Sequence, residues 1–337
     1  MSNGNDNDNI PIDYLAWVEE YASGRVIGAI IDSPLLPASM RQQARWEHDE
    51  VMASLPIPRM ADADLSAIVG SAKGQLCTPW HFYLRSDPNV AMTGAQKTGD
   101  CVSWGVRTSS DTTRCWEVWN KSDEAYVKRQ ATCLIYSGRG YNGQGASPAR
   151  LSKWHVETGF LLEDLFTDTA GKQWDFREYS SYVRLGMSHG RSGFPSSITD
   201  ITKKHKLETC SLVEDMDALA DALWNGYGAH CGSSIGVSSS GDPISRLRGS
   251  WAHDMAIVGF DDRPETIAKF GSRIWFWDQS WGDWNKVVNI PQEWLPWGQG
   301  MFALSENDTW RAVKHGGTWV FSNSNGFPAR PFDNLLI

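Results

Sequence analysis

The segment QKTGDC, residues Gln96–Cys101, ends in a cysteine that directly follows a Gly-Asp turn. Asp100 is a good helix N-cap, and the following residues predict a helix from Cys101 to Lys121. In the first turn of a helix, the free backbone N–H groups and the helix dipole stabilise a thiolate. Cys101 therefore fits a nucleophile, whereas a lone cysteine without such a context is usually a small buried thiol.

Two further segments carry groups that suit cysteine chemistry. HDMAIVGF, His253–Phe260, begins with a histidine and continues as an apolar strand. A histidine held on such an element can act as a general base toward a thiol. WDQSWG, Trp277–Gly282, follows the next expected strand, where the Gln279 amide can accept from a ring N–H and fix the tautomer. Taken alone, these segments also fit a structural histidine and a glycine-containing turn.

The order and context of the three segments resemble the papain-like cysteine peptidase family. Its motifs are a Gln shortly before a helix-capping Cys, a His that opens a strand in a His-Ala-Val-x-x-Val-Gly-Tyr pattern, and Asn-Ser-Trp-Gly. The resemblance extends over about residues 90–305, and the glycine-rich stretch Tyr136–Gly145 is similar to divergent bacterial and tailed-phage members.

The resemblance implies a role for each matching residue. Cys101 is the expected nucleophile and His253 the expected base, and Gln96 with the backbone N–H of Cys101 is the expected oxyanion hole. Gln279 stands where the family has its orienting Asn, and Trp281 is expected to shield that contact from water. Two departures bear on activity: Gln279 is one methylene longer than Asn, and Gln96 lies one residue closer to the cysteine than is usual.

The pattern of elements predicts an α+β fold with an antiparallel sheet, because helices precede strands without βαβ alternation. The papain-like resemblance implies a helical half that carries Cys101 and a β half that carries His253. Expected helices after the first are Ser147–Thr158 and Glu214–Trp224, and expected strands are Cys231–Ser238, Met255–Phe260, Ile274–Trp277 and Val287–Ile290.

Three regions are expected along the chain. Residues 1–90 predict an extension, polar over its first nine residues and helical over Asp13–Tyr21 and Ala38–Leu55. Residues 91–310 predict the papain-like domain, and residues 311–337 a C-terminal tail. We expect the extension to supply no catalytic group and to offer contacts to an assembly partner.

The amino-acid composition disfavours several classes of function. The formal net charge of -9 disfavours nucleic-acid binding, which needs clustered basic residues. No apolar stretch approaches the ~20 residues of a membrane span. The N-terminal sequence lacks the regions of a signal peptide, so a cytoplasmic or virion-associated location is expected. The six cysteines form neither a C-x-x-C pair nor a Cys/His cluster, which predicts free thiols and no metal or cofactor.

Two other motifs are weaker. Gly232–Gly236 fits the G-x-S-x-G elbow around Ser234, but the expected strand runs through it and no helix follows directly. Gly138–Gly143 fits G-x-G-x-x-G, but it follows a helix end instead of a strand. The sequence therefore favours a cysteine hydrolase that cleaves peptide or amide bonds of a peptide or protein substrate. The alternative is a virion-associated or scaffold protein with a papain-like fold and a weakened site, which the 18 tryptophans and Gln279 also fit.

Overall fold

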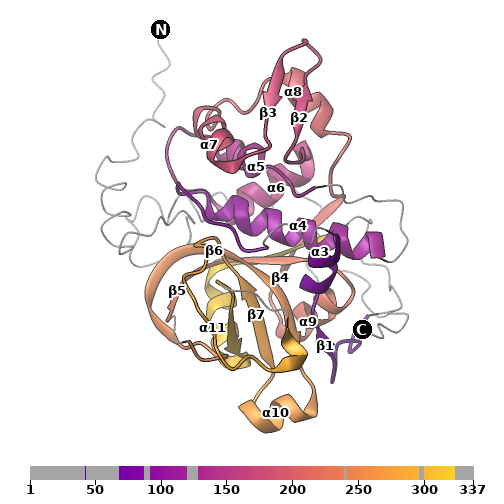
Figure 1. Ribbon diagram of the computed structural model, residues 1–337, viewed down its shortest axis with the longest axis vertical. Coiled ribbons are helices and arrows are strands. Elements are labelled where there is room, and N and C mark those ends of the chain that lie inside the picture. Colours follow the sequence, from indigo (N-terminus) through magenta and orange to yellow (C-terminus); the bar gives the residue numbers. More distant parts are fainter. Residues whose placement is uncertain are drawn as a thin grey trace.

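The computed structural model describes residues 42, 68–86, 92–119, 128–238, 241–295 and 300–322 (Figure 1). In this part of the chain, a helical half and an antiparallel sheet pack on opposite sides of one long helix, α4. The helices are α3 (Trp80–Ser86), α4 (Cys101–Trp119), α5 (Thr132–Tyr136), α6 (Pro148–Thr158), α7 (Tyr179–Ser188), α8 (Ser196–Thr202), α9 (Met216–Trp224), α10 (Pro264–Phe270) and α11 (Glu306–Gly316), with short 3₁₀ turns at Ser137–Arg139 and Gln292–Trp294.

The sheet has seven strands, and each pairing is antiparallel. Its order is β4-β9-β5-β6-β7-β8, with β1 paired to β6, and a separate hairpin, β2–β3, stands on the helical half. The strands are β1 (Leu76–Cys77), β2 (Leu165–Thr167), β3 (Gln173–Asp175), β4 (Thr209–Val213), β5 (Ala229–Val237), β6 (Leu247–Asp261), β7 (Ile274–Asp278), β8 (Phe302–Ser305) and β9 (Thr318–Ser322). The predicted α+β class is confirmed, with Cys101 at the start of α4 in the helical half and His253 on β6.

Helix α4 is rich in serine and threonine, which have low helix propensity because their hydroxyls compete for backbone groups. Here those hydroxyls bond back to carbonyls one turn earlier: Ser109 to Gly105, Ser110 to Val106 and Thr112 to Thr108. Residues 101–117 are all buried. A helix enclosed on every side needs its hydroxyls satisfied internally, and this pattern satisfies those of Ser109, Ser110 and Thr112. The buried Ser103 hydroxyl, by contrast, has no hydrogen-bond partner among the described residues.

Local signals placed several other elements correctly. Helix α6 begins at Pro148 after the Ser147 cap and ends at Gly159, which has a φ of 80°. Helix α9 follows the Asp215 cap, whose side chain accepts from Ala218 N. The expected strands at 231–238, 255–260 and 274–277 correspond to β5, to part of β6 and to β7. The helices expected at 13–21 and 38–55 lie outside the described residues, Gln42 apart.

One expected strand, Val287–Ile290, is wrong. Asn289 has a φ of 56°, which breaks an extended run, and Val288 is 57% exposed. The backbone N–H of Val288 instead bonds to Gly241 O at 2.8 Å. The apolar alternation there reflects a loop that bonds to the connection between β5 and β6, and not a strand of the sheet.

Short segments from the two flanking regions, residues 1–90 and 311–337, form strands of the sheet. Leu76 and Cys77 pair with the end of β6, although they precede residue 91. Thr318–Ser322 pairs with both β4 and β5, so part of the expected tail is an inner strand. Thr318–Ser322 is rich in residues that favour strands, but neither contribution has a local signal for its pairing, because its partners lie far away in the sequence.

All six cysteines are buried free thiols. Within the described residues, no helix is long and apolar enough to cross a membrane, and no cluster of His, Cys, Asp and Glu side chains is placed to hold a metal ion.

Candidate active site

Cys101 is the first residue of α4 and is fully buried. The helix starts here because the carbonyl of Asp100 accepts the N–H groups of Ser103 (2.9 Å) and Trp104 (3.3 Å). The predicted helix-start position of Cys101 is thereby confirmed. The sulfur belongs to the N-terminal turn, where backbone N–H groups and the helix dipole favour negative charge.

His253 lies within β6, opposite Ser233 of β5. We expected it to open a strand, but β6 begins at Leu247, because residues 247–252 also pair with β5 across two register shifts. His253 is fully buried, and its ring stacks on Trp281 with centroids 4.1 Å apart and an interplanar angle of 17°. The placement of Trp281 against the histidine agrees with the resemblance.

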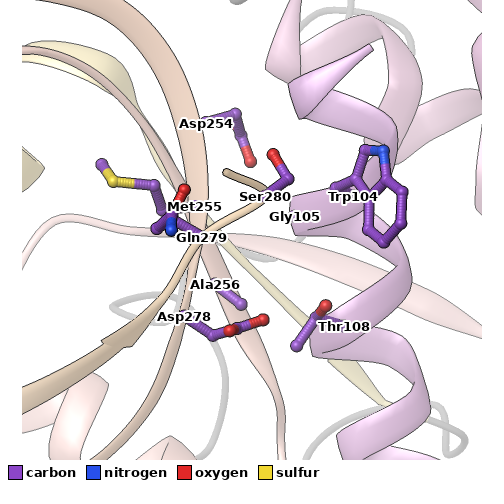
Figure 2. A pocket seen from close by; sticks show the side chains of 9 residues that line it. All are labelled: Trp104, Gly105, Thr108, Asp254, Met255, Ala256, Asp278, Gln279 and Ser280. Atoms are coloured by element: carbon purple, nitrogen blue, oxygen red, sulfur yellow. The ribbon is translucent and has the colours of Figure 1, made fainter. Parts of the chain in front are cut away.

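The N-terminal turns of α4 pack closely against β6 near His253. A Cβ atom on Gly105 would lie 1.9 Å from Oδ1 of Asp254, so only glycine fits at this position. Figure 2 shows the small pocket between α4 and the strands, with Asp278 and Thr108 pointing toward each other and Met255 pointing away from the helix. The pocket is lined by Trp104, Gly105, Thr108, Asp254, Met255, Ala256, Asp278, Gln279 and Ser280.

Gln96 lies in the loop before α4 and meets the turn that follows β7. Its backbone N–H bonds to Ser280 O at 2.7 Å, and its Oε1 accepts from the Ser280 hydroxyl. Next to it, Ala95 and Trp281 form an isolated antiparallel bridge. The Nε2 of Gln96 donates to Thr98 O at 2.8 Å, inside its own loop. The structure therefore brings Gln96 to the tryptophan that covers His253.

Gln279 follows the last residue of β7, as expected, and is buried. Its Nε2 donates to Gly300 O at 3.0 Å, and its Oε1 accepts from the backbone N–H of Trp281. An amide oxygen has two lone pairs, so the Trp281 bond uses half of its accepting capacity. These bonds hold the turn that presents Trp281 to the histidine ring.

A buried carboxyl precedes the cysteine. Both oxygens of Asp100 receive the Tyr179 hydroxyl, at 3.0 and 3.1 Å. Burial raises the pKa of Asp100 to about 7, although the Tyr179 hydrogen bond and the nearby Arg107 charge oppose the shift. The sequence identified Asp100 only as a helix cap and gave no sign of Tyr179.

A second buried carboxyl follows the histidine. Nδ1 of His230 lies 3.0 Å from Oδ1 of Asp254 and 3.1 Å from its Oδ2, and Nε2 of His230 lies 2.8 Å from the Ser152 hydroxyl. Burial raises the pKa of Asp254, and the neighbouring His230 opposes that shift. All three side chains are buried. Their hydrogen bonds link α6 of the helical half to β5 and β6 of the sheet.

Among solved structures, the chain is similar to xylellain, a cysteine protease from Xylella fastidiosa, with a TM-score of 0.49 at 15% identity over 78% of this chain and 90% of that one. It is also similar to the proform of the ragweed pollen cysteine protease Amb a 11, with a TM-score of 0.47 at 13% identity over 84% and 76%. For proCathepsin B S9 from Trypanosoma congolense the TM-score is 0.48 at 11% identity over 95% and 99%. No protein-family model and no curated protein matches the sequence.

Proposed function

We propose that this chain is a papain-like cysteine hydrolase that cleaves peptide or amide bonds in a peptide or protein substrate. The observation that carries the proposal is the bridge between Ala95 and Trp281. It ties the loop that leads into Cys101 to the tryptophan stacked on His253. Two segments more than 150 residues apart are thus joined where a nucleophile and a base would have to meet.

In the proposed reaction, His253 takes the proton of the Cys101 thiol and the thiolate attacks the substrate carbonyl carbon. The resulting oxyanion is received by the Gln96 side chain and the Cys101 backbone N–H. Collapse of the intermediate breaks the C–N bond, and the leaving amine takes the proton from His253. Water, deprotonated by His253, then hydrolyses the thioester. The proposed role of Gln279 is to orient the imidazole: its Oε1, which already accepts from Trp281 N, would use its second lone pair to accept from the other ring nitrogen of His253.

A second candidate is a binding or scaffold protein, such as a virion component of the phage type, built on the same fold without activity. The observation that favours it is the side chain of Gln279, which already bonds to Gly300 and Trp281. A residue that serves chiefly to hold a turn need not orient a base. Folds of one type host many functions, so the reactivity of the site has to decide between the two candidates.

Labelling of the full-length protein with an epoxide electrophile of the type used for thiol proteases tests the proposal. We expect selective modification of Cys101, and His253→Ala should slow it by roughly 10²-fold or more, the usual worth of a general base. Cys101→Ala should abolish labelling, whereas Cys115→Ala, which removes another buried thiol from the same helix, should leave it unchanged. Equal labelling of the parent and the Cys101→Ala variant would favour the scaffold candidate.

A further inference from the structure

The loop from Gln96 to Asp100 carries both groups that the proposed oxyanion hole needs. Gln96 supplies a side-chain amide at its beginning, and the N–H of Cys101 follows directly at its end. Other contacts restrain its middle: Gly99 N donates to Gln144 Oε1 at 2.8 Å, and Gly145 N donates to Gly99 O at 3.0 Å. Donors of an oxyanion hole work because their positions are fixed before the reaction, so whatever holds this loop affects the rate.

One side chain bonds to the loop at both ends. Tyr179 is the first residue of α7, and its Oη accepts the backbone N–H of Lys97 at 2.9 Å. The same hydroxyl lies 3.0 and 3.1 Å from the two oxygens of Asp100. The hydroxyl donates its one hydrogen to the Asp100 carboxyl and accepts from Lys97 through an oxygen lone pair. A single O–H group thus joins the residue after Gln96 to the residue before Cys101.

The ring of Tyr179 is held independently of its hydroxyl. It packs edge-on against Trp104 of α4, with centroids 4.9 Å apart and an interplanar angle of 69°. It also meets Tyr182 of its own helix at 5.6 Å and 87°. Because these contacts belong to the ring, removal of the hydroxyl alone leaves the packing in place.

We propose that Tyr179 is a positioning residue that sets the distance between the two oxyanion donors. This inference rests on the proposed function. Tyr179 acts through the backbone of Lys97 and the carboxyl of Asp100. Without the hydroxyl, the N–H of Lys97 and the carboxyl of Asp100 lose a partner that they share, and the loop between them gains freedom.

The test compares two reactions of Cys101 that differ in their need for an oxyanion hole. Acylation by an activated peptide ester passes through an oxyanion, whereas alkylation by iodoacetamide does not. Tyr179→Phe should lower kcat for acylation by roughly 10- to 100-fold, less than the 10²–10³ seen when an oxyanion donor is deleted outright. The alkylation rate should change little. General destabilisation of the protein would slow both reactions of Cys101. A lower kcat for acylation with an unchanged alkylation rate therefore indicates an effect on the oxyanion hole.

Tyr182→Phe is the matched control. It lies on the same helix, is fully buried, and loses a hydrogen bond to Glu163 of 2.7 Å that does not involve the loop. Both reactions should proceed in this variant as in the parent. If Tyr179→Phe does not fold, Asp100→Ala removes one end of the bridge and should lower acylation relative to alkylation in the same direction.

The possible outcomes separate the two proposals. A loss of acylation alone in Tyr179→Phe supports the positioning role. Equal loss of both reactions, or loss of neither, overturns it while the cysteine hydrolase survives. Absence of Cys101 acylation in the parent overturns the proposed function and the positioning role together.

Discussion

The two sides of the candidate site each place a buried carboxyl next to the residue that would do the chemistry, but they stabilise it differently. On the nucleophile side, Asp100 precedes Cys101 and receives the neutral hydroxyl of Tyr179. On the base side, Asp254 follows His253 and faces the imidazole of His230, a group that can carry a positive charge. Both carboxyls are about 1% exposed, so burial alone does not distinguish them.

The comparison shows how the hydrogen-bonding partner of a buried carboxyl group affects its ionisation. The Tyr179 phenol donates a hydrogen bond to Asp100 but carries no positive charge to balance a carboxylate. The protonated acid is therefore the state of lowest free energy for Asp100 up to its pKa of about 7. The imidazole of His230 opposes the burial-driven rise in the pKa of Asp254 both by charge and by its hydrogen bond, although burial still raises that pKa. We therefore expect loss of the partner to matter most on the base side, where His230 supplies a charge as well as a hydrogen bond, whereas Tyr179 supplies only a hydrogen bond to Asp100.

The largest expected effect is on the base side. His230→Ala leaves Asp254 buried opposite an empty space, and breaking a buried charged pair in this way typically costs about 3–5 kcal/mol. Urea unfolding should show the loss directly. His155→Ala is the matched control, because His155 is also fully buried, and its Nε2 lies 3.2 Å from the Ser110 hydroxyl, away from Asp254.

Burial lowers the pKa of His155 to about 3, so this side chain is neutral at ordinary pH and its removal leaves no charge behind. The excess loss in His230→Ala over His155→Ala measures what the Asp254 pair contributes. Similar losses in the two variants would mean that Asp254 is already protonated, which would remove the contrast between the two sides.

The next effect is the pH dependence of the nucleophile side. The pKa of Asp100 is about 7 in the folded protein, above its ordinary value of 3.8. Between these values the native state binds more protons than the unfolded state, so the free energy of unfolding falls as pH rises. The slope from one such group is at most about 1.4 kcal/mol per pH unit.

Asp100→Asn keeps a helix cap and removes the titration. The difference in unfolding free energy between this variant and the parent should therefore move in favour of the variant from about pH 4 to pH 7 and level off above it. The difference curve also cancels the contribution of Asp278, whose pKa burial raises to about 6. A flat difference curve would show that Asp100 is ionised at low pH, like an exposed acid.

Sequence predicted what local signals encode. Gly99-Asp100 indicated the start of α4, Ser147-Pro148 that of α6, and the apolar run at 274–277 indicated β7. Each of these elements carries its own cap, breaker or periodicity. The order of the three motif segments also placed Gln96, His253 and Trp281 in one region, because the resemblance supplied the long-range information that spacing lacks.

What the sequence did not reveal depends on contacts between distant residues. Tyr179 meets Asp100 across 79 positions, and His230 meets Asp254 across 24. No cap or period marks a side chain that bonds across the fold. The missed strand β9 differs in part, because Thr318–Ser322 is rich in residues that favour strands, and only its place between β4 and β5 depends on distant contacts.

The smallest expected effect concerns Gln279, which serves the base side through a turn. Gln279→Ala should lower single-turnover acylation of Cys101 by roughly 10- to 100-fold, about 1.4–2.7 kcal/mol of barrier. The amide contributes either by accepting from the imidazole or by holding Trp281 over His253 through its bonds to Gly300 and Trp281 N. The two contributions predict different results for the shorter amide.

Gln279→Asn separates these contributions. If the amide orients the imidazole at the distance usual for the resembled family, the variant should acylate as fast as the parent or faster. If the amide mainly holds the turn, Asn is one methylene too short to keep the 3.0 Å bond to Gly300 O, and the variant should resemble Gln279→Ala. Acylation at the parental rate in Gln279→Ala, with Cys101 still essential, would mean that another group holds His253 and that the base side does not depend on this turn.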